Sequence, residues 1–233
     1  MSKNNARHRI GVVVAIELDA VLAKYGTPSE TVRRHGYTVH TYINDDFFLF
    51  VIDAGAGEIS AAAATQVLIS EYDVELVLNF GVAGALTEEI KTAELCIIER
   101  AIHYDFDTTD WLDLPRGQYP GHDSPYLAAD AALLARALEI KPDLKKVTCA
   151  SADKFISLPK AKAALHTDYQ ADICEMEAAG ILLTCRRCGV PCLLLKAVSD
   201  SLLGGGGEFL QELNRVSGIC FDVLDQIVRG IRL

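Results

Sequence analysis

Apolar runs alternate with amphipathic stretches along most of the chain. Short apolar runs bounded by polar residues are typical of buried strands, and stretches with a period near 3.6 are typical of helices that cover a sheet. The pattern predicts strands at 9–16, 37–43, 47–53, 74–80, 94–104, 145–151, 171–176 and 191–198, and helices at 17–25, 57–71, 126–139, 159–166, 177–188 and 207–230. We therefore expect an α/β fold with three layers, α/β/α, around a central mixed, mostly parallel sheet.

Length and charge narrow the kind of protein. The 233 residues suit a single domain, 1–233, and no stretch approaches the roughly 20 apolar residues that a membrane helix needs. Residues 10–16 read as a buried strand rather than a signal-peptide core. The 22 basic and 32 acidic residues give a net charge of −10, which disfavours binding to nucleic acid. We expect a cytoplasmic protein that binds a small molecule or a second copy of itself, and neither nucleic acid nor a membrane.

The seven cysteines do not suggest a disulfide framework, because their number is odd and most lie in apolar runs. Cys185, Cys188 and Cys192 are spaced closely enough to suggest a metal site, but no second Cys/His pair stands at a suitable distance. We interpret them as reduced, buried thiols, and we predict neither a metal nor a cofactor.

Glycine marks three segments. Residues 55–57 and 81–84 follow strands, where small residues form tight turns or let a ligand approach the main chain; neither matches a known dinucleotide or phosphate motif. The four glycines at 204–207 precede a long amphipathic helix and predict a mobile loop, which is a candidate for a lid.

Acidic residues in apolar surroundings are the most informative feature. Glu17 and Asp19 follow the first strand, Glu175 and Glu177 flank a helix start, and Asp200 ends a very apolar run. Each could be a helix cap, but carboxylates at several strand ends of one sheet are expected to gather at one edge, where α/β folds bind ligands. A carboxyl group that donates a proton at one end of a substrate, with an oriented water at the other, is the chemistry that cleaves a glycosidic bond.

A series of short motifs in one order resembles the purine nucleoside phosphorylase superfamily, and within it the 5′-methylthioadenosine/S-adenosylhomocysteine nucleosidases. The matching segments cover nearly the whole chain: 10–19 (IGVVVAIELD), 53–57 (DAGAG), 79–86 (NFGVAGAL), 103–107 (HYDFD), 117–121 (GQYPG), 151–156 (SADKFI), 175–179 (EMEAA), 190–191 (VP) and 196–200 (KAVSD). The resemblance implies a nucleoside phosphorylase-like fold, a homodimer, and hydrolysis of the N-glycosidic bond of an adenine nucleoside without a cofactor.

The resemblance also assigns roles. Asp200 would protonate or hydrogen-bond N7 of the purine, with Ser199 positioning it. Met176 and Glu177 would hold the ribose, and Phe155 would stack on the base.

Four further residues complete the implied binding site. The main chain of Ile156 would read the edge of the base, Gly84 would line the site, and Ile16 stands where the family has Met near the 5′ substituent. The loop near Pro120 would reach the 5′ pocket across the dimer interface.

The water site departs from the family. Where the family has Glu, Ser and Arg, this chain has Asp19, Val82 and Lys196. The acidic side chain is one methylene shorter, the hydroxyl is lost, and the planar guanidinium group of arginine is replaced by an ammonium group. Either Glu17 or Asp19 would then act as the base, or turnover would be slow, or another nucleoside would be preferred.

Three alternatives remain open. The first is another purine nucleosidase, such as one that acts on futalosine. The second is a phosphate-dependent phosphorylase, which is disfavoured because residues 79–82 (NFGV) lack the Arg-x-Gly-[Ser/Thr] turn of those enzymes and no Gly-Asp-Pro segment is present. The third is a weakly active nucleoside-binding protein.

Overall fold

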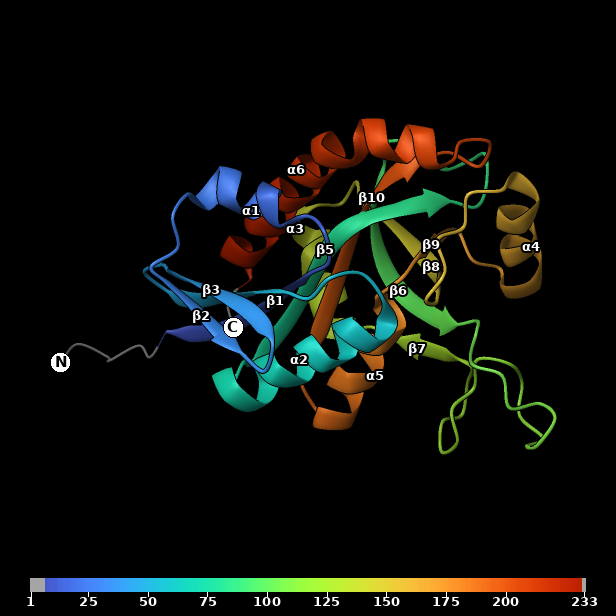
Figure 1. Cartoon of the computed structure of the whole chain (residues 1–233), viewed down its shortest axis with the longest axis horizontal. Helices are drawn as coiled ribbons and strands as arrows, with labels where there is room; N and C mark the ends of the chain where they lie inside the picture. Colours follow the sequence, from blue (N-terminus) through green and yellow to red (C-terminus); the bar gives the residue numbers. More distant parts are fainter. Residues whose placement is uncertain (1–6, 232–233) are drawn as a thin grey trace.

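A ten-stranded sheet forms the centre of the molecule in the computed structural model, which describes residues 7–231 (Figure 1). The strands are β1 (His8–Val14), β2 (Glu30–Arg34), β3 (Tyr37–Ile43), β4 (Phe47–Asp53), β5 (Leu76–Ala85), β6 (Leu95–His103), β7 (Tyr126–Ala128), β8 (Lys145–Ser151), β9 (Ile173–Glu175) and β10 (Cys192–Asp200). The helices are α1 (Leu18–Tyr25), α2 (Glu58–Tyr72), α3 (Ala131–Ile140), α4 (Pro159–Tyr169), α5 (Ala178–Cys188) and α6 (Gly206–Gly230).

The sheet closes on itself at one end. β5 pairs in parallel with β1 and β10 and antiparallel with β9. β10 also pairs with β6, and β6 leads through β8 and β9 back to β5, so these five strands form a ring. β1, β4, β3 and β2 extend from β5 as an open wing. Parallel and antiparallel pairs occur together, as the predicted mixed sheet requires.

Helices cover both faces of the sheet. Side chains alternate between faces along a strand, so Val13 joins an apolar layer with α2 and α5, while Val12 and Val14 join a second layer with α3 and α6. Figure 1 shows α2 and α5 below the sheet and α1 and α6 above it. The predicted α/β layering is therefore confirmed.

Local sequence explains where several helices begin and end. The side chain of Asp130 accepts a hydrogen bond from the main-chain nitrogen of Leu133 at 2.9 Å, which caps α3. Gly189 ends α5 in the left-handed conformation, and Pro159 begins α4 in the first turn, where its missing N–H costs nothing.

Four elements differ from the prediction. β5 continues to Ala85, so the segment 81–84, expected to follow the strand, belongs to it. The helix expected at 126–139 begins only at Ala131, because Tyr126–Ala128 pairs with β6 as β7. β2 was not expected, since it is a polar edge strand with four exposed residues. α6 begins at Gly206, so two of the four consecutive glycines belong to its first turn.

The strand directions place the functional site. β4, β1, β5 and β10 run parallel to one another in this order, so their carboxyl ends meet at one edge. Loops and helix starts that follow these strands converge there. Within residues 7–231 no helix combines the length and apolar character that crossing a membrane requires.

Candidate functional site

A cleft of about 160 Å³ lies at the edge where these strands end. It joins segments that are far apart in the sequence, from the end of β1 to the first turns of α6. Its lining residues are Ala15, Ile16, Glu17, Ala56, Val82, Ala83, Gly84, Phe155, Cys174, Glu175, Met176, Glu177, Ser199, Asp200 and Phe209. Nine of the twelve candidate residues named from the sequence are therefore brought together; Asp19, Ile156 and Lys196 do not line the cleft.

Asp200 ends β10 and is 2% exposed. The hydroxyl of Ser199 donates to its Oδ1 at 2.8 Å, and the ammonium of Lys162 lies 2.5 Å from its Oδ2. A Cβ on Gly84 would lie 3.0 Å from Oδ2, so the glycine leaves room for the carboxylate. Asp200 is therefore held on both oxygens in a site without space to turn.

Lys162 is a functional candidate that the sequence did not reveal. It lies on α4, is 0% exposed, and donates to the main-chain oxygens of Ser201 at 2.6 Å and Gly204 at 3.4 Å in addition to Asp200. α4 is otherwise polar and largely exposed, so nothing in its pattern separates Lys162 from the exposed Lys160.

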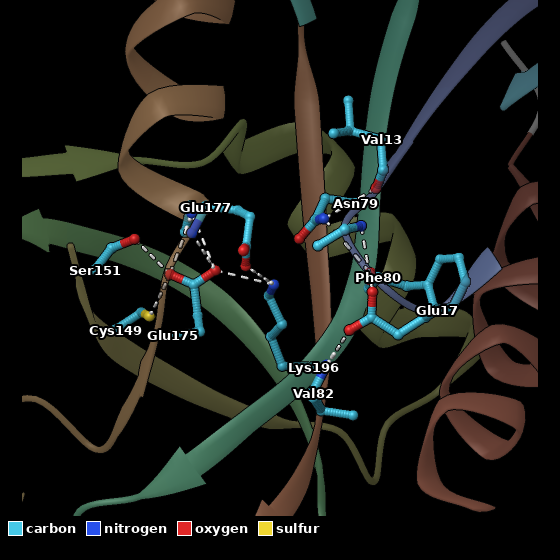
Figure 2. Close-up of polar contacts among 12 residues, drawn as sticks. Val13, Glu17, Asn79, Phe80, Val82, Cys149, Ser151, Glu175, Glu177 and Lys196 are labelled. Atoms are coloured by element: carbon cyan, nitrogen blue, oxygen red, sulfur yellow. Dashed lines mark hydrogen bonds and ion pairs between the residues drawn. The ribbon is translucent and has the colours of Figure 1, made fainter. Parts of the chain in front are cut away.

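Glu175 is the last residue of β9, close to the N-terminus of α5, and it lines the cleft. It accepts hydrogen bonds from the main-chain nitrogens of Glu177 and Ala178 at 3.0 Å, and its Oε2 is 2.9 Å from the Lys196 ammonium. Burial disfavours its charge, but Lys196 and these donors outweigh burial and leave the pKa of Glu175 below its usual value. Figure 2 shows Lys196 directed toward this pair of glutamates.

Lys196 is fully occupied by acidic partners. It lies 3.7 Å from Glu177 Oε2 as well as against Glu175. Burial alone would lower its pKa, but the negative charges of Glu175, Glu177 and Glu17 raise it. Lys196 is therefore a permanent cation behind the cleft wall rather than a free group that faces the ligand.

Glu177 faces the cleft, and its pKa is shifted in the opposite direction to that of Glu175. Burial and the neighbouring Glu175 raise its pKa to about 8, although Lys196 opposes the shift. The main-chain N–H of Gly57, at the start of α2, donates to its Oε1 at 3.1 Å. At neutral pH Glu177 can consequently hold a proton and both donate and accept hydrogen bonds.

Glu58, which the sequence analysis did not select, extends this buried acidic cluster. Its side chain accepts from the main-chain nitrogen of Gly180 and contacts the hydroxyl oxygen of Ser151, which also lies 2.5 Å from Glu175 Oε1 and so links the two carboxyl groups. Burial, with Glu175 next, raises the pKa of Glu58 to about 8. The small residues at 178–180 were the available signal, since they let α2 approach α5 closely.

Glu17 reaches back over the end of β1 and is 5% exposed. Its Oε1 accepts from the main-chain nitrogen of Val82 at 3.1 Å, and its Oε2 accepts from those of Ile16 at 2.9 Å and Ala15 at 3.3 Å. An oxygen of a carboxylate can accept two hydrogen bonds, so Oε1 keeps one free position. A Cβ on Gly81 would lie 2.6 Å from Oε1, which makes this glycine necessary for the contact.

Asp19 lies elsewhere. It is exposed on the first turn of α1 and lines a second, more open cavity of about 430 Å³ between α1 and α6. Glu17 and Ile16 line both cavities. The described geometry thus brings Glu17, and not Asp19, to the cleft that holds Asp200.

Aromatic side chains form the opposite wall. Phe155 is 51% exposed, and its ring meets Phe209 of α6 edge to face with centroids 5.2 Å apart. Ile156 is half-buried and packs against the apolar cluster that contains Cys174. A flat ring could be enclosed between Phe155 and the strand ends.

No metal centre is built from the described residues 7–231: no group of three or more His, Cys, Asp or Glu side chains is arranged to hold an ion. All seven cysteines are free thiols, and only Cys188 among them is exposed. The predicted burial is confirmed for Cys185 and Cys192 and is wrong for Cys188, which lies exposed in the last turn of α5.

The geometry defines two chemical poles. Asp200 with Lys162 stands at one end, and Glu17 and Glu177 stand at the other. A substrate between them can receive a proton at the first pole while a hydroxyl or a water is oriented at the second.

Known proteins are similar to this chain in sequence and in fold. The sequence model of the Phosphorylase superfamily matches residues 9–229. An aminodeoxyfutalosine nucleosidase of Helicobacter pylori is 27% identical over 214 residues, covering 88% of this chain and 92% of that protein. A 5′-methylthioadenosine/S-adenosylhomocysteine nucleosidase of Marinomonas is 30% identical over 203 residues, covering 82% and 85%.

A solved structure agrees with both. It is the Helicobacter pylori 5′-methylthioadenosine/S-adenosylhomocysteine nucleosidase in complex with a 4-aminopyrrolopyrimidine joined to a pyrrolidinol. It superposes with a TM-score of 0.91 at 26% identity and covers 96% of this chain and 99% of its own. With the family model matching nearly all described residues, the chain belongs to the phosphorylase superfamily.

Proposed function

We propose that this protein is a nucleosidase that hydrolyses the N-glycosidic bond of adenine nucleosides, releasing adenine and the free ribose derivative. The observation that carries the proposal is the meeting of Asp200, Glu177 and Glu17 in one cleft. Relatives named for 5′-methylthioadenosine, S-adenosylhomocysteine and aminodeoxyfutalosine support the substrate class.

Asp200 acts on the leaving group. A proton delivered to N7 of the purine lets the base depart as a neutral molecule when the bond to C1′ breaks. Ser199 fixes one oxygen of this carboxyl at 2.8 Å. Phe155 covers the face of the base, and Ile156 lies next to it in sequence to meet its edge.

Glu177 and Met176 hold the ribose. A carboxyl group with a pKa of about 8 can accept from one ribose hydroxyl and donate to another. As the bond breaks, the ribose gains positive charge, and the acidic surroundings of Glu177 stabilise that charge. Met176 supplies an apolar contact beside it.

Glu17 orients and deprotonates the attacking water. Its Oε1 keeps one free acceptor position facing the cleft end near Val82. The water oxygen forms the new bond to C1′, its proton passes to Glu17, and the electron pair of the old bond leaves with the base. This assigns to Glu17 the role that the family resemblance gives to the position of Asp19.

Water is a better nucleophile here than phosphate. Glu17 and Glu175 bring negative charge to this end, and Lys196 is already paired with Glu175 at 2.9 Å. A phosphate dianion would meet repulsion from these carboxylates, and the paired Lys196 offers little to offset it.

Purified protein incubated with 5′-methylthioadenosine, S-adenosylhomocysteine and aminodeoxyfutalosine tests the function. We expect adenine and a reducing sugar, at rates independent of added phosphate. Obligatory phosphate with a ribose-1-phosphate product would instead identify a phosphorylase. Tight nucleoside binding without product would identify a binding protein, and inosine as a fourth substrate separates adenine preference from general purine cleavage.

The assembly and compartment are part of the proposal. We expect a homodimer in which the loop around Pro120 reaches toward the partner's 5′ pocket, and light scattering after size exclusion measures the mass. Seven free thiols are typical of a reducing compartment such as the cytoplasm.

A further inference from the structure

We propose that Lys162, acting through Asp200, makes the binding of an adenine base proton-linked: the empty site holds Asp200 as a carboxylate, and the bound base takes up one proton there. Lys162 is thus a positioning residue for the leaving-group step. This inference rests on the proposed function, because it requires the base to face Asp200.

The contacts describe a charged pair. Lys162 donates to Asp200 Oδ2 at 2.5 Å, to the Ser201 carbonyl at 2.6 Å and to the Gly204 carbonyl at 3.4 Å, which uses all three N–H groups of an ammonium. The hydroxyl of Ser199 donates to the other carboxylate oxygen. Both oxygens of Asp200 accept hydrogen bonds, which is the pattern of an ionised carboxylate.

Because both side chains are buried, each charge of this pair is stabilised by the other charge and not by water. Lys162 is 0% and Asp200 is 2% exposed, so water cannot replace either partner. Removing one member of a buried ion pair leaves a charge that neutralises by gaining or losing a proton. The ionisation of Asp200 in the empty site therefore depends on Lys162.

The other groups around Asp200 do not replace Lys162. Cys174, from β9, approaches from the side of Gly84, and burial raises its pKa to about 12, which keeps it a neutral thiol. Glu208, from α6, is an anion engaged with Ser201 and with the Thr92 hydroxyl at 2.6 Å. Among the described residues, Lys162 is the cation in contact with Asp200.

An adenine joined through N9, as in a nucleoside, presents an N6 amino donor beside an N7 atom that carries only a lone pair. A carboxylate can accept from N6, but its second oxygen meets the lone pair of N7. One added proton resolves this conflict, because one oxygen then accepts from N6 while the proton lies between the other oxygen and N7. The proton comes from solvent as the base binds, and Lys162 keeps its own three.

Calorimetric titration of the protein with 9-methyladenine, whose N9 substituent leaves N7 with only a lone pair, counts this proton in buffers of different ionisation enthalpy near pH 7.5. We expect uptake of about one proton per bound ligand in the wild type and about none in Lys162→Met, whose lone buried Asp200 is already protonated. The wild-type dissociation constant should rise about tenfold for each pH unit above neutrality, and that of the variant should stay level. Lys160→Met, on the exposed side of the same helix, should behave as wild type.

The outcomes separate the two proposals. Wild-type binding without proton uptake, or equal uptake by Lys162→Met, overturns the role of Lys162 and leaves the nucleosidase proposal standing. A wild type that binds no 9-methyladenine contradicts both. If Lys162→Met does not fold, Lys162→Gln removes the charge while keeping two N–H donors, and the same loss of proton uptake is expected.

Discussion

The carboxylate of Glu17 meets the main-chain nitrogen of Val82 at 3.1 Å, joining the start of α1 to the middle of the closed part of the sheet. Figure 2 shows this contact in the same region as Lys196 and the paired glutamates. Asp19, two residues further along, points to a different cavity. This relationship separates two candidate bases that the sequence alone left equivalent.

Glu17→Gln should therefore lower kcat for nucleoside cleavage by at least about 100-fold, because the amide cannot take a proton from water. Asp19→Asn, the matched control, should keep kcat close to that of the wild type. Adenine release followed by absorbance measures both. Equal losses in the two variants, or a loss confined to Asp19→Asn, would return the water site to Asp19.

Asp200→Asn should lower kcat by about 100-fold or more, because an amide cannot deliver a proton to N7. The exposed Asp168 on α4 provides a control of the same chemistry, and Asp168→Asn should be silent. An unchanged rate in Asp200→Asn would remove this residue from the leaving-group step.

Lys162 and Asp200 should be coupled in stability. Each single substitution, Lys162→Met or Asp200→Asn, leaves the other partner buried without its counter-ion, so each should lower the free energy of unfolding. The double variant should be more stable than the sum of the two losses predicts, by about 1–3 kcal/mol. Urea unfolding of the four proteins measures this coupling, and simple additivity would show that the pair does not interact.

Glu58 should make stability fall as the pH rises. Its folded pKa of about 8 lies above the ordinary 4.5, so between these values the folded protein keeps a proton that the unfolded chain has lost. Stability from this group is complete at low pH and is lost as the pH approaches 8. Glu58→Gln should flatten the dependence of Tm on pH across this window, with Glu177 leaving a residual slope. An unchanged slope would contradict the raised pKa.

Two helical glycines should respond in opposite ways to alanine. A Cβ on Gly180 would lie 2.5 Å from the Glu58 carbonyl oxygen, so Gly180→Ala should cost about 1–3 kcal/mol by forcing α5 from α2. A Cβ on Gly218 in α6 would meet nothing within 4 Å, so Gly218→Ala should stabilise by about 0.5–1 kcal/mol through helix propensity. Thermal unfolding distinguishes them, and destabilisation by both would contradict the open space at Gly218.

Periodicity located much of the fold because burial in this sheet follows local sequence. The bounds of β3, β4 and β8 agree with the predicted strands residue for residue. β2 was not predicted because its exposed residues show no alternation of apolar and polar positions. β7 was not predicted because its three residues, which pair with β6, have the same pattern as the helix that begins after them. β7 forms because it pairs with β6, which lies outside any local window, whereas β2 forms by pairing with the adjacent β3.

Local sequence likewise identified only part of the candidate site. Glu17, Glu177 and Asp200 could be identified because they follow or end apolar strands, where an acidic residue is conspicuous. Lys162 and Glu58 lie on helices where lysine and glutamate are ordinary, and their burial comes from contacts with segments 38 and 93 residues away. Separating Glu17 from Asp19 required the path of the chain after β1.

The donors that hold Glu17 all belong to the main chain, at Ala15, Ile16 and Val82. Peptide groups persist whichever amino acid occupies a position, so lineages of this superfamily can exchange the side chain at residue 82 without dismantling the anchor. In a saturation library, hydroxyl and aliphatic residues at 82 should be recovered side by side among active clones, whereas residue 17 should tolerate almost nothing else.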